Sequence, residues 1–286
     1  MTSLAVDLQR FLDASPATAL VEVAEALGST PREQGAWMLV SPDAIFSTIG
    51  GGQLEFMAIA KAREMLGTER SRPINKAVSL DIPLGPEIGQ CCGGRVNLSI
   101  RPVDERLRAE LRKEAKRQDA ARPHVLIFGG GHVGHSLAAA LALLPVRPMV
   151  IETRADALEG MPPDIETRLT PVPEEMVREA PPHAAYVVLT HDHALDFLIV
   201  AEALRRGDAA YVGMIGSRTK KATFRSWFLK TADGSEEAYE RLVSPIGGPA
   251  VKDKRPAVIA ALAAAEIMTA LASATFPGSA AGSARP

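Results

Sequence analysis

The segment from residue 124 to residue 152 constrains the fold of this 286-residue chain more than any other. An apolar run, His124-Val-Leu-Ile-Phe128, leads directly into Gly129-Gly-Gly131-His-Val-Gly134, and an Ala- and Leu-rich stretch follows over His135–Leu144. This order predicts a buried strand, a tight glycine turn and a helix. The glycines permit the turn, let the backbone approach a phosphate and let the helix pack on the strand, while the helix N-terminus offers amides and a positive dipole end to an anion.

A second predicted strand, Arg147–Ile151, ends at an acidic residue. Glu152 lies eighteen residues after Gly134, near the place of the ribose-binding acid in a dinucleotide fold. Arg154 could instead favour an extra phosphate, so the choice between the two nicotinamide dinucleotides stays open. Strand, turn, helix and acid together predict a Rossmann-like, doubly wound parallel sheet over residues 123–272.

Two later apolar runs, Ala184–Thr190 and Ala210–Ile215, predict further buried strands that each end in a polar loop. In an open parallel sheet these loops lie at the carboxyl ends of the strands, where ligands bind. The loop after the second run carries three basic side chains that we expect to hold a phosphate: Arg218, Lys220 and Lys221. The alternative is an ordinary solvated helix start.

The loop after the first run contains His191-Asp-His193, with Asp196 beyond it. Asp192 is well placed to cap the helix that we expect to continue through Arg206. Zinc sites place their ligands at recognisable spacings, and these spacings are absent here. We therefore interpret this loop as a helix start rather than a metal site.

The N-terminal part, residues 1–103, has the mixed pattern of a smaller α/β domain. Residues 104–122 are dense in Lys, Arg and Glu and predict a solvated helical connector, while the Ala/Ser/Gly/Pro-rich stretch 273–286 predicts a disordered tail. Within the first part we expect helices at 3–14 and 53–66, strands at 19–27, 76–82 and 95–101, and a hairpin formed by 36–40 and 44–49.

The only two cysteines are adjacent, Cys91 and Cys92, and two glycines follow them. A disulfide between neighbours would close a strained ring and staple no loop. Both sulfurs could instead face a thiophilic metal or a sulfur atom in transit, and the amides of Gly93 and Gly94 could face an anion. The alternative is a pair of small apolar residues in a buried turn.

Composition excludes some classes of function. The net charge is −2, thirty-two basic residues balance thirty-four acidic ones, and aromatic residues make up 5%, so a nucleic-acid groove is not expected. The first ten residues lack the apolar core of a signal peptide, and the apolar runs are shorter than the ~20 residues that span a bilayer. Two thiols without a disulfide framework are typical of proteins in the reducing cytoplasm, so we expect a cytoplasmic protein.

Six motifs in this order resemble one family, the xanthine dehydrogenase accessory proteins, which are chaperones of the molybdenum cofactor. The motifs are Gly28-Ser-Thr-Pro-Arg-Glu-Gln-Gly-Ala-Trp-Met-Leu-Val40, Ile49-Gly-Gly-Gly-Gln-Leu-Glu55, Gly89-Gln-Cys-Cys-Gly-Gly94, Ile127-Phe-Gly-Gly-Gly-His-Val-Gly134, Thr190-His-Asp-His-Ala-Leu-Asp196 and Tyr211-Val-Gly-Met-Ile-Gly-Ser-Arg218. The resemblance spans nearly the whole chain.

The resemblance implies an accessory protein rather than an enzyme. It implies that the chain binds molybdopterin bearing molybdenum, holds it while a cysteine desulfurase supplies the terminal sulfido ligand, and hands it to apo-xanthine dehydrogenase, and that the chain forms a homo-oligomer. Gln90, Cys91 and Cys92 would form the cofactor-facing loop, with the two thiols as candidate molybdenum contacts or sulfur carriers. With the residues discussed above, the expected cofactor-binding set is Gln90, Cys91, Cys92, Gly93, Gly94, Gly129, Gly131, His132, Gly134, Glu152, Arg218 and Lys220.

The chain departs from the family pattern near its C-terminus. It has Ser244-Pro-Ile-Gly-Gly248 where the family often has Cys-Pro-Ile-Gly-Leu, and Asp253-Lys-Arg-Pro256 where a Gly-Lys-Pro-like turn is usual. A ligand role for this loop is therefore not expected from the resemblance.

Two other functions compete with the accessory role. An NAD(P)-dependent oxidoreductase would use the same fold, but only His191 and His193 suggest a proton-transfer pair, and the double cysteine would be unexplained. A nucleotidyltransferase that attaches cytidine to the molybdenum cofactor would favour a different glycine-rich signature, which the N-terminus lacks.

Overall fold

The computed structural model describes residues 3–67, 76–86, 93–248 and 251–275. The chain divides into two compact units, one over Thr2–Ala121 and the other from Arg122 onward. Gln90, Cys91 and Cys92 lie outside the described residues, as does most of the expected tail.

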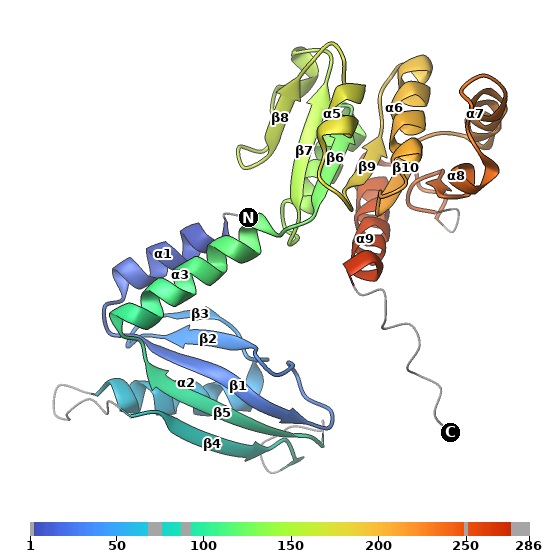
Figure 1. The fold of residues 1–286 in the computed structure, drawn as a ribbon. Coiled ribbons are helices and arrows are strands. Elements are labelled where there is room, and N and C mark those ends of the chain that lie inside the picture. The colour runs from blue at the N-terminus through green and yellow to red at the C-terminus, as the bar shows by residue number, and fades with distance from the viewer. Residues whose placement is uncertain (1–2, 68–75, 87–92, 249–250, 276–286) are drawn as a thin grey trace, which may run out of the picture. The chain divides into compact units, whose positions relative to one another are not determined.

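The first unit is a five-stranded antiparallel sheet with helices on both faces, in the strand order β3-β2-β1-β5-β4 (Figure 1). Its elements match the mixed α/β pattern predicted from the sequence. In chain order they are α1 (Leu4–Ala14), β1 (Ala19–Leu27), β2 (Trp37–Val40), β3 (Ile45–Ser47), α2 (Gly52–Leu66), β4 (Val78–Pro83), β5 (Arg95–Pro102) and α3 (Glu105–Ala120).

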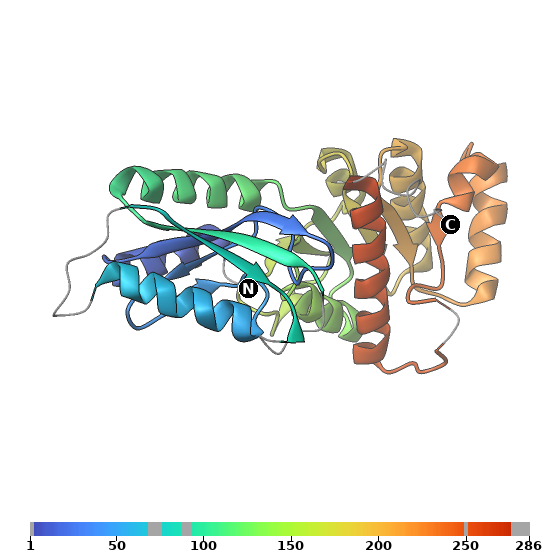
Figure 2. The same cartoon turned by 90° about the horizontal axis from the view of Figure 1, so that it is seen from below.

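Strand β1 explains why this sheet has helices on both sides. Successive side chains of a strand point to opposite faces. Ala19, Val21 and Val23 pack in the core that contains α2, whereas Leu20 packs in the core that contains α1 and α3. Figure 2 shows this sheet between α3, in green, and α2, in light blue.

Helix α3 is more closely packed than the solvated connector expected at 104–122. Leu107 and Ala115 are buried against α1, and Arg108 is buried with its guanidinium donating to the carbonyl oxygens of Leu12 and Ser15 at 2.8 and 3.0 Å. In the sequence, the many charged residues of this helix concealed the few apolar residues that pack against α1. A buried arginine whose donors are satisfied by backbone carbonyls is a stable arrangement.

The second unit is a six-stranded, wholly parallel sheet, and the predicted Rossmann-like fold is confirmed. Its order, β11-β10-β9-β6-β7-β8, corresponds to the 3-2-1-4-5-6 order of the dinucleotide-binding fold when the strands are counted within the unit. The strands are β6 (His124–Phe128), β7 (Arg147–Glu152), β8 (Glu166–Leu169), β9 (Ala185–Val188), β10 (Tyr211–Met214) and β11 (Leu242–Val243).

Two helical layers cover this sheet. Helices α4 (His132–Leu141) and α9 (Pro256–Thr275) lie on one face, and α5 (Glu174–Glu179), α6 (His193–Arg206), α7 (Arg218–Lys230) and α8 (Glu236–Glu240) belong to the other. Val125 and Ile127 of β6 pack on the first layer, and Leu126 and Phe128 pack on the second. Burial on both faces is the reason that β6 is a continuous apolar run.

Helix α9, red in Figures 1 and 2, is the one helix within the described ranges that is long and apolar enough to cross a membrane by length and composition. It packs on α4, and Ala260, Ala263, Ile267 and Leu271 are buried in the core of the second unit. A core helix of a globular domain passes the same test of length and composition.

Candidate ligand-binding site

The glycine turn joins β6 to α4, and three of its glycines are required by packing within the protein. A Cβ atom would lie 2.6 Å from the Leu189 carbonyl oxygen at Gly129, 2.4 Å from the Ala157 carbonyl oxygen at Gly130, and 2.0 Å from the Gly129 carbonyl oxygen at Gly134. The last contact is the close packing of helix on strand that the sequence predicted.

Gly131 is different. A Cβ atom there would meet no atom within 4 Å, and its φ of −74° suits any residue. Nothing in the described chain therefore requires glycine at this position. Gly131 is also the N-cap of α4, so the helix starts at His132, three residues before the start expected at His135. The amides of the first helical turn have no carbonyl partner within the helix and are available to an anion.

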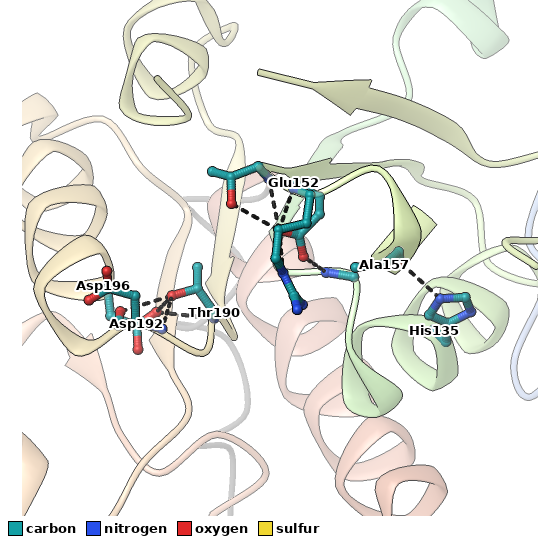
Figure 3. A network of polar contacts seen from close by, with 9 residues as sticks. His135, Glu152, Ala157, Thr190, Asp192 and Asp196 are labelled. Atoms are coloured by element: carbon teal, nitrogen blue, oxygen red, sulfur yellow. Dashed lines mark hydrogen bonds and ion pairs between the residues drawn. The ribbon is translucent and has the colours of Figure 1, made fainter. Parts of the chain in front are cut away.

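Glu152, at the end of β7, is bound to the turn by hydrogen bonds (Figure 3). Its side chain is 5% exposed. One carboxylate oxygen accepts from the Gly130 amide at 2.8 Å. The other accepts from the amides of Thr153 and Arg154, at 2.8 and 3.2 Å, and from the Thr153 hydroxyl at 3.2 Å. Burial by itself would raise the pKa of Glu152, but these hydrogen bonds outweigh it and hold the pKa below the ordinary value.

Two hollows adjoin the turn and share four lining residues, Gly131, His132, Arg154 and Pro256. The smaller, of about 390 Å³, lies over the carboxyl ends of β6, β7, β9 and β10, and its other lining residues are Gly129, Val133, Gly134, Glu152, Leu189, Thr190, His191 and Ile215. The larger, of about 810 Å³, lies between the first turn of α4 and the start of α9, and its other lining residues are Gly130, His135, Ser136, Asp156, Ala157, Arg255 and Ala257.

Two side chains that line the larger hollow, those of His135 and Arg255, have polar partners within the protein. His135 Nε2 lies 3.1 Å from the Ala157 carbonyl oxygen (Figure 3). Arg255 forms a bidentate ion pair with Asp253, which holds the guanidinium at the start of α9 and keeps the pKa of Asp253 below its ordinary value. The Asp253–Pro256 segment, which departs from the family pattern, thus brings a basic group to this hollow.

Asp192 caps α6, as the sequence predicted. Its carboxylate accepts from the amides of Ala194 and Leu195 at 2.8 and 3.4 Å. His191 lines the smaller hollow, and His193 is the exposed first residue of α6. Within residues 3–67, 76–86, 93–248 and 251–275, no three His, Cys, Asp or Glu side chains are grouped to hold a metal.

A buried ion pair between Asp196 and Lys220 contacts residues that line the smaller hollow. Asp196 is fully buried and accepts from the Thr190 amide at 3.1 Å and the Thr190 hydroxyl at 2.7 Å, and Figure 3 shows this part of the network. It also pairs with the Lys220 ammonium, which donates in addition to the Ile215 carbonyl oxygen at 3.1 Å. Thr190 and Ile215 line the smaller hollow, so the Asp196–Lys220 pair holds two of its lining residues in place through these hydrogen bonds.

The structure thus gathers Gly129, Gly131, His132, Gly134 and Glu152 around the smaller hollow. Arg218 and Lys220 line neither hollow, because Arg218 is the exposed first residue of α7 and Lys220 is buried against Asp196. The basic side chains at the turn are Arg154 and Arg255. Arg154 could be recognised in the sequence from its position after Glu152. Arg255 could not, because it lies in the Asp253–Pro256 segment, which departs from the family motif.

Only the end of the cysteine loop belongs to the described residues. Gly93 donates its amide to the Leu84 carbonyl oxygen at 2.9 Å, and Leu84 donates to the Gly94 carbonyl oxygen at 2.8 Å. A Cβ atom at Gly94 would lie 2.2 Å from the Ser29 carbonyl oxygen. The Gly93 amide, which we expected to face an anion, is therefore bonded to the protein, and Gly94 is needed for packing against residues 27–29.

Both units match models of one protein family. Residues 125–267 match the XdhC Rossmann domain, and residues 12–79 match the XdhC and CoxI family. The chain belongs to the XdhC family. The glycine turn, Glu152 and the Asp196–Lys220 pair all lie inside the matched Rossmann domain of this XdhC protein, and the resemblance found in the six motifs is confirmed.

Two relatives extend the comparison. The uncharacterized protein YqeB of Escherichia coli K12 is 24% identical to this XdhC protein over 239 residues, and the chain spans about two fifths of the length of YqeB. A solved structure named as a xanthine dehydrogenase from Bacillus halodurans superposes with a TM-score of 0.79 at 17% identity, covering 95% of this chain and 96% of the other. That similarity establishes the shared fold.

Proposed function

We propose that this XdhC-family protein binds the molybdenum cofactor at the glycine turn and delivers it to apo-xanthine dehydrogenase. Family membership supports a role in the maturation of xanthine dehydrogenase. The finer steps belong to the proposal: the protein holds the cofactor in the cytoplasm while a cysteine desulfurase supplies sulfur, acts as a homo-oligomer, and then releases the cofactor to its partner.

The observation that carries the proposal is the open space at Gly131. The turn lacks a side chain at the one glycine position where nothing in the described chain would obstruct it. At a helix N-terminus that borders two hollows, a missing Cβ with no packing reason suits close approach of a ligand to the backbone. The position lies on the border of both hollows.

The chemistry of the surroundings fits molybdopterin, which carries a phosphate, a polar pterin and a dithiolene-bound metal. The first-turn amides of α4 and the Arg154 guanidinium suit the phosphate. The Thr190 hydroxyl and the His191 imidazole at the smaller hollow suit the polar edge of a pterin. When bound, the cofactor would supply a soft metal, and Cys91 and Cys92 are the residues whose thiolates would suit it.

The test is an anaerobic titration of molybdopterin into the purified full-length protein. Gly131→Leu is expected to weaken binding more than tenfold, because the new side chain occupies the space of the ligand. Ala265→Leu is the control, since it adds the same side chain at an exposed position of α9 that lines neither hollow. Equal affinity in the parent and Gly131→Leu contradicts the proposal, and hydride transfer with NADH would favour the oxidoreductase instead.

A further inference from the structure

We infer that a second copy of this chain docks along edge strand β8. The two β8 strands pair antiparallel about a two-fold axis at Thr167 and so join the parallel sheets of the two copies edge to edge. The proposed function takes the protein to be a homo-oligomer, and the inference rests on that part of it alone. It assigns the surface through which the copies meet.

Strand β8 is an uncovered edge of the second unit's sheet (Figure 1), and all four of its residues are exposed. The other edge of that sheet, β11, spans two residues, of which Leu242 is buried. In the first unit, edge strand β3 spans three residues and edge strand β4 contains Pro83, which has no amide hydrogen. Short edges and prolines prevent edge-to-edge pairing. Among the edges that the structure describes, β8 is therefore the one best suited to pair.

The outer backbone groups of β8 belong to Thr167 and Leu169. Thr170 donates its amide to the Glu152 carbonyl oxygen at 3.0 Å, so the alternate residues before it also bond to β7 in the parallel ladder. The residues between them, Thr167 and Leu169, therefore direct their N–H and C=O groups away from the sheet. Such a row of outward groups is the template along which another strand pairs.

Two charged side chains of β8 select the register. Glu166 and Arg168 lie in register with Met149 and Ile151 of β7, on the sheet face that carries α5 and α6. With Thr167 opposite its own copy, Glu166 of each chain lies opposite Arg168 of the other, and opposite charges in this position attract. A shift by two residues in either direction places Glu166 opposite Glu166 or Arg168 opposite Arg168, which is unfavourable. A shift by one residue brings outward backbone groups against inward ones.

These two charges are available to a second copy. Within residues 3–67, 76–86, 93–248 and 251–275, the side chains of Glu166 and Arg168 take part in no hydrogen bond or ion pair, and both are exposed. The pairing thus gives each of them an opposite charge without breaking a contact inside its own chain.

Leu169 adds an apolar contact on the other face of the sheet. Thr167 lies in register with Val150, so Thr167 and Leu169 share the face that carries α4 and α9. Leu169 is 53% exposed, and in the inferred pairing it lies opposite Ile165 of the second copy, a residue that is 6% exposed in the core beneath these helices. Removal of the leucine from water favours association.

The dimer formed in this way is reversible and sensitive to salt. A strand of four residues makes a short seam, so the interface belongs with the weak ones that bury less than ~1,200 Å². The cross-strand ion pairs are exposed and are screened by salt, so the dimer should weaken as the ionic strength rises.

The test is sedimentation velocity of the full-length protein from roughly 1 to 100 µM, where we expect a reversible dimer. Thr167→Pro removes an outward amide, leaves the hydrogen bonds to β7 in place and should give a monomer at every concentration. Glu166→Arg and Arg168→Glu place like charges across the seam, and each should raise the dissociation constant roughly tenfold or more. Glu237→Arg, on exposed α8 beside β11, is the control for a charge reversal and should associate as the parent does. Circular dichroism checks that each variant is folded.

Charge restoration tests the register. The double variant Glu166→Arg/Arg168→Glu again has opposite charges across the seam and should dimerise about as tightly as the parent. An equimolar mixture of the two single variants should form a mixed dimer, because each cross-strand pair then joins opposite signs. A loss of association caused by misfolding would be rescued in neither experiment.

The inference is overturned if the parent is a monomer over the whole concentration range, or if Thr167→Pro and the single charge reversals associate as the parent does. It is also overturned if neither the double variant nor the mixture restores association. Molybdopterin binding by a monomeric parent would refute this inference alone, and a parent that dimerises through β8 without binding molybdopterin would refute cofactor binding alone.

Discussion

Removal of the Lys220 side chain amine should destabilise the second unit far more than removal of an exposed charge on the same helix. Asp196 is 0% exposed and the Lys220 side chain 7% exposed. In Lys220→Met the carboxylate stays buried, and the donors that remain to it among the described residues are the Thr190 amide and hydroxyl. Breaking a buried pair from one side costs about 3–5 kcal/mol, which is a large part of the 5–15 kcal/mol that stabilises a typical protein.

The double variant Asp196→Asn/Lys220→Met removes both charges and is expected to be more stable than Lys220→Met alone. Replacing a buried pair by neutral groups of similar volume leaves no uncompensated charge. The coupling energy between the two sites should therefore be of order 1–3 kcal/mol in a double-mutant cycle. The matched control is Arg225→Gln on α7, which breaks a half-exposed pair with Glu236 of α8 and should cost about 0–1 kcal/mol.

The assay is urea unfolding followed by tryptophan fluorescence. The chain has two tryptophans, Trp37 in the first unit and Trp227 in the second, so a Trp37→Phe background reports on the second unit alone. Trp227 lies on α7 with its ring centroid 5.6 Å from that of Phe197 on α6, and it senses the helices that the pair joins. A Lys220→Met variant as stable as Arg225→Gln would refute the reasoning.

Three further outcomes are expected. Since its pKa is lowered in the folded protein, Glu152 contributes stability that is fully present above its ordinary pKa of 4.5 and is lost as the pH falls through the lower folded value; urea midpoints at pH 7 and pH 4 should therefore differ less in Glu152→Gln than in the parent. Tyr211, whose pKa is raised by burial, donates to Glu266 at 2.7 Å, so Tyr211→Phe should cost about 1–3 kcal/mol in thermal unfolding, and no change in midpoint would contradict this. Cys91→Ala, Cys92→Ala and the double variant should fold as the parent does by circular dichroism but lose molybdopterin or the ability to activate apo-xanthine dehydrogenase; full activity in all three would make the cysteines packing residues.

The sequence alone determined the architecture of the second unit and the position of its candidate ligand site. The apolar run of β6 is long enough to be buried on both faces, and the glycines after it have no other common use than a tight turn before a helix. Asp192 was predictable as a cap because capping is local, between residues two and three apart. In the first unit the alternation in β1 predicted a strand for the same reason.

Tertiary structure decided the partners of the charged groups. Lys220 was expected at a phosphate, but its ammonium pairs with Asp196, 24 residues away, because α6 and α7 pack side by side on the same face of the sheet. Edge strand β8 escaped prediction because it is exposed along its whole length and has no apolar period. Glu152 occupied the predicted position, yet the sequence could not show that four protein donors use its oxygens, since hydrogen-bond partners depend on the distances that only the folded chain sets.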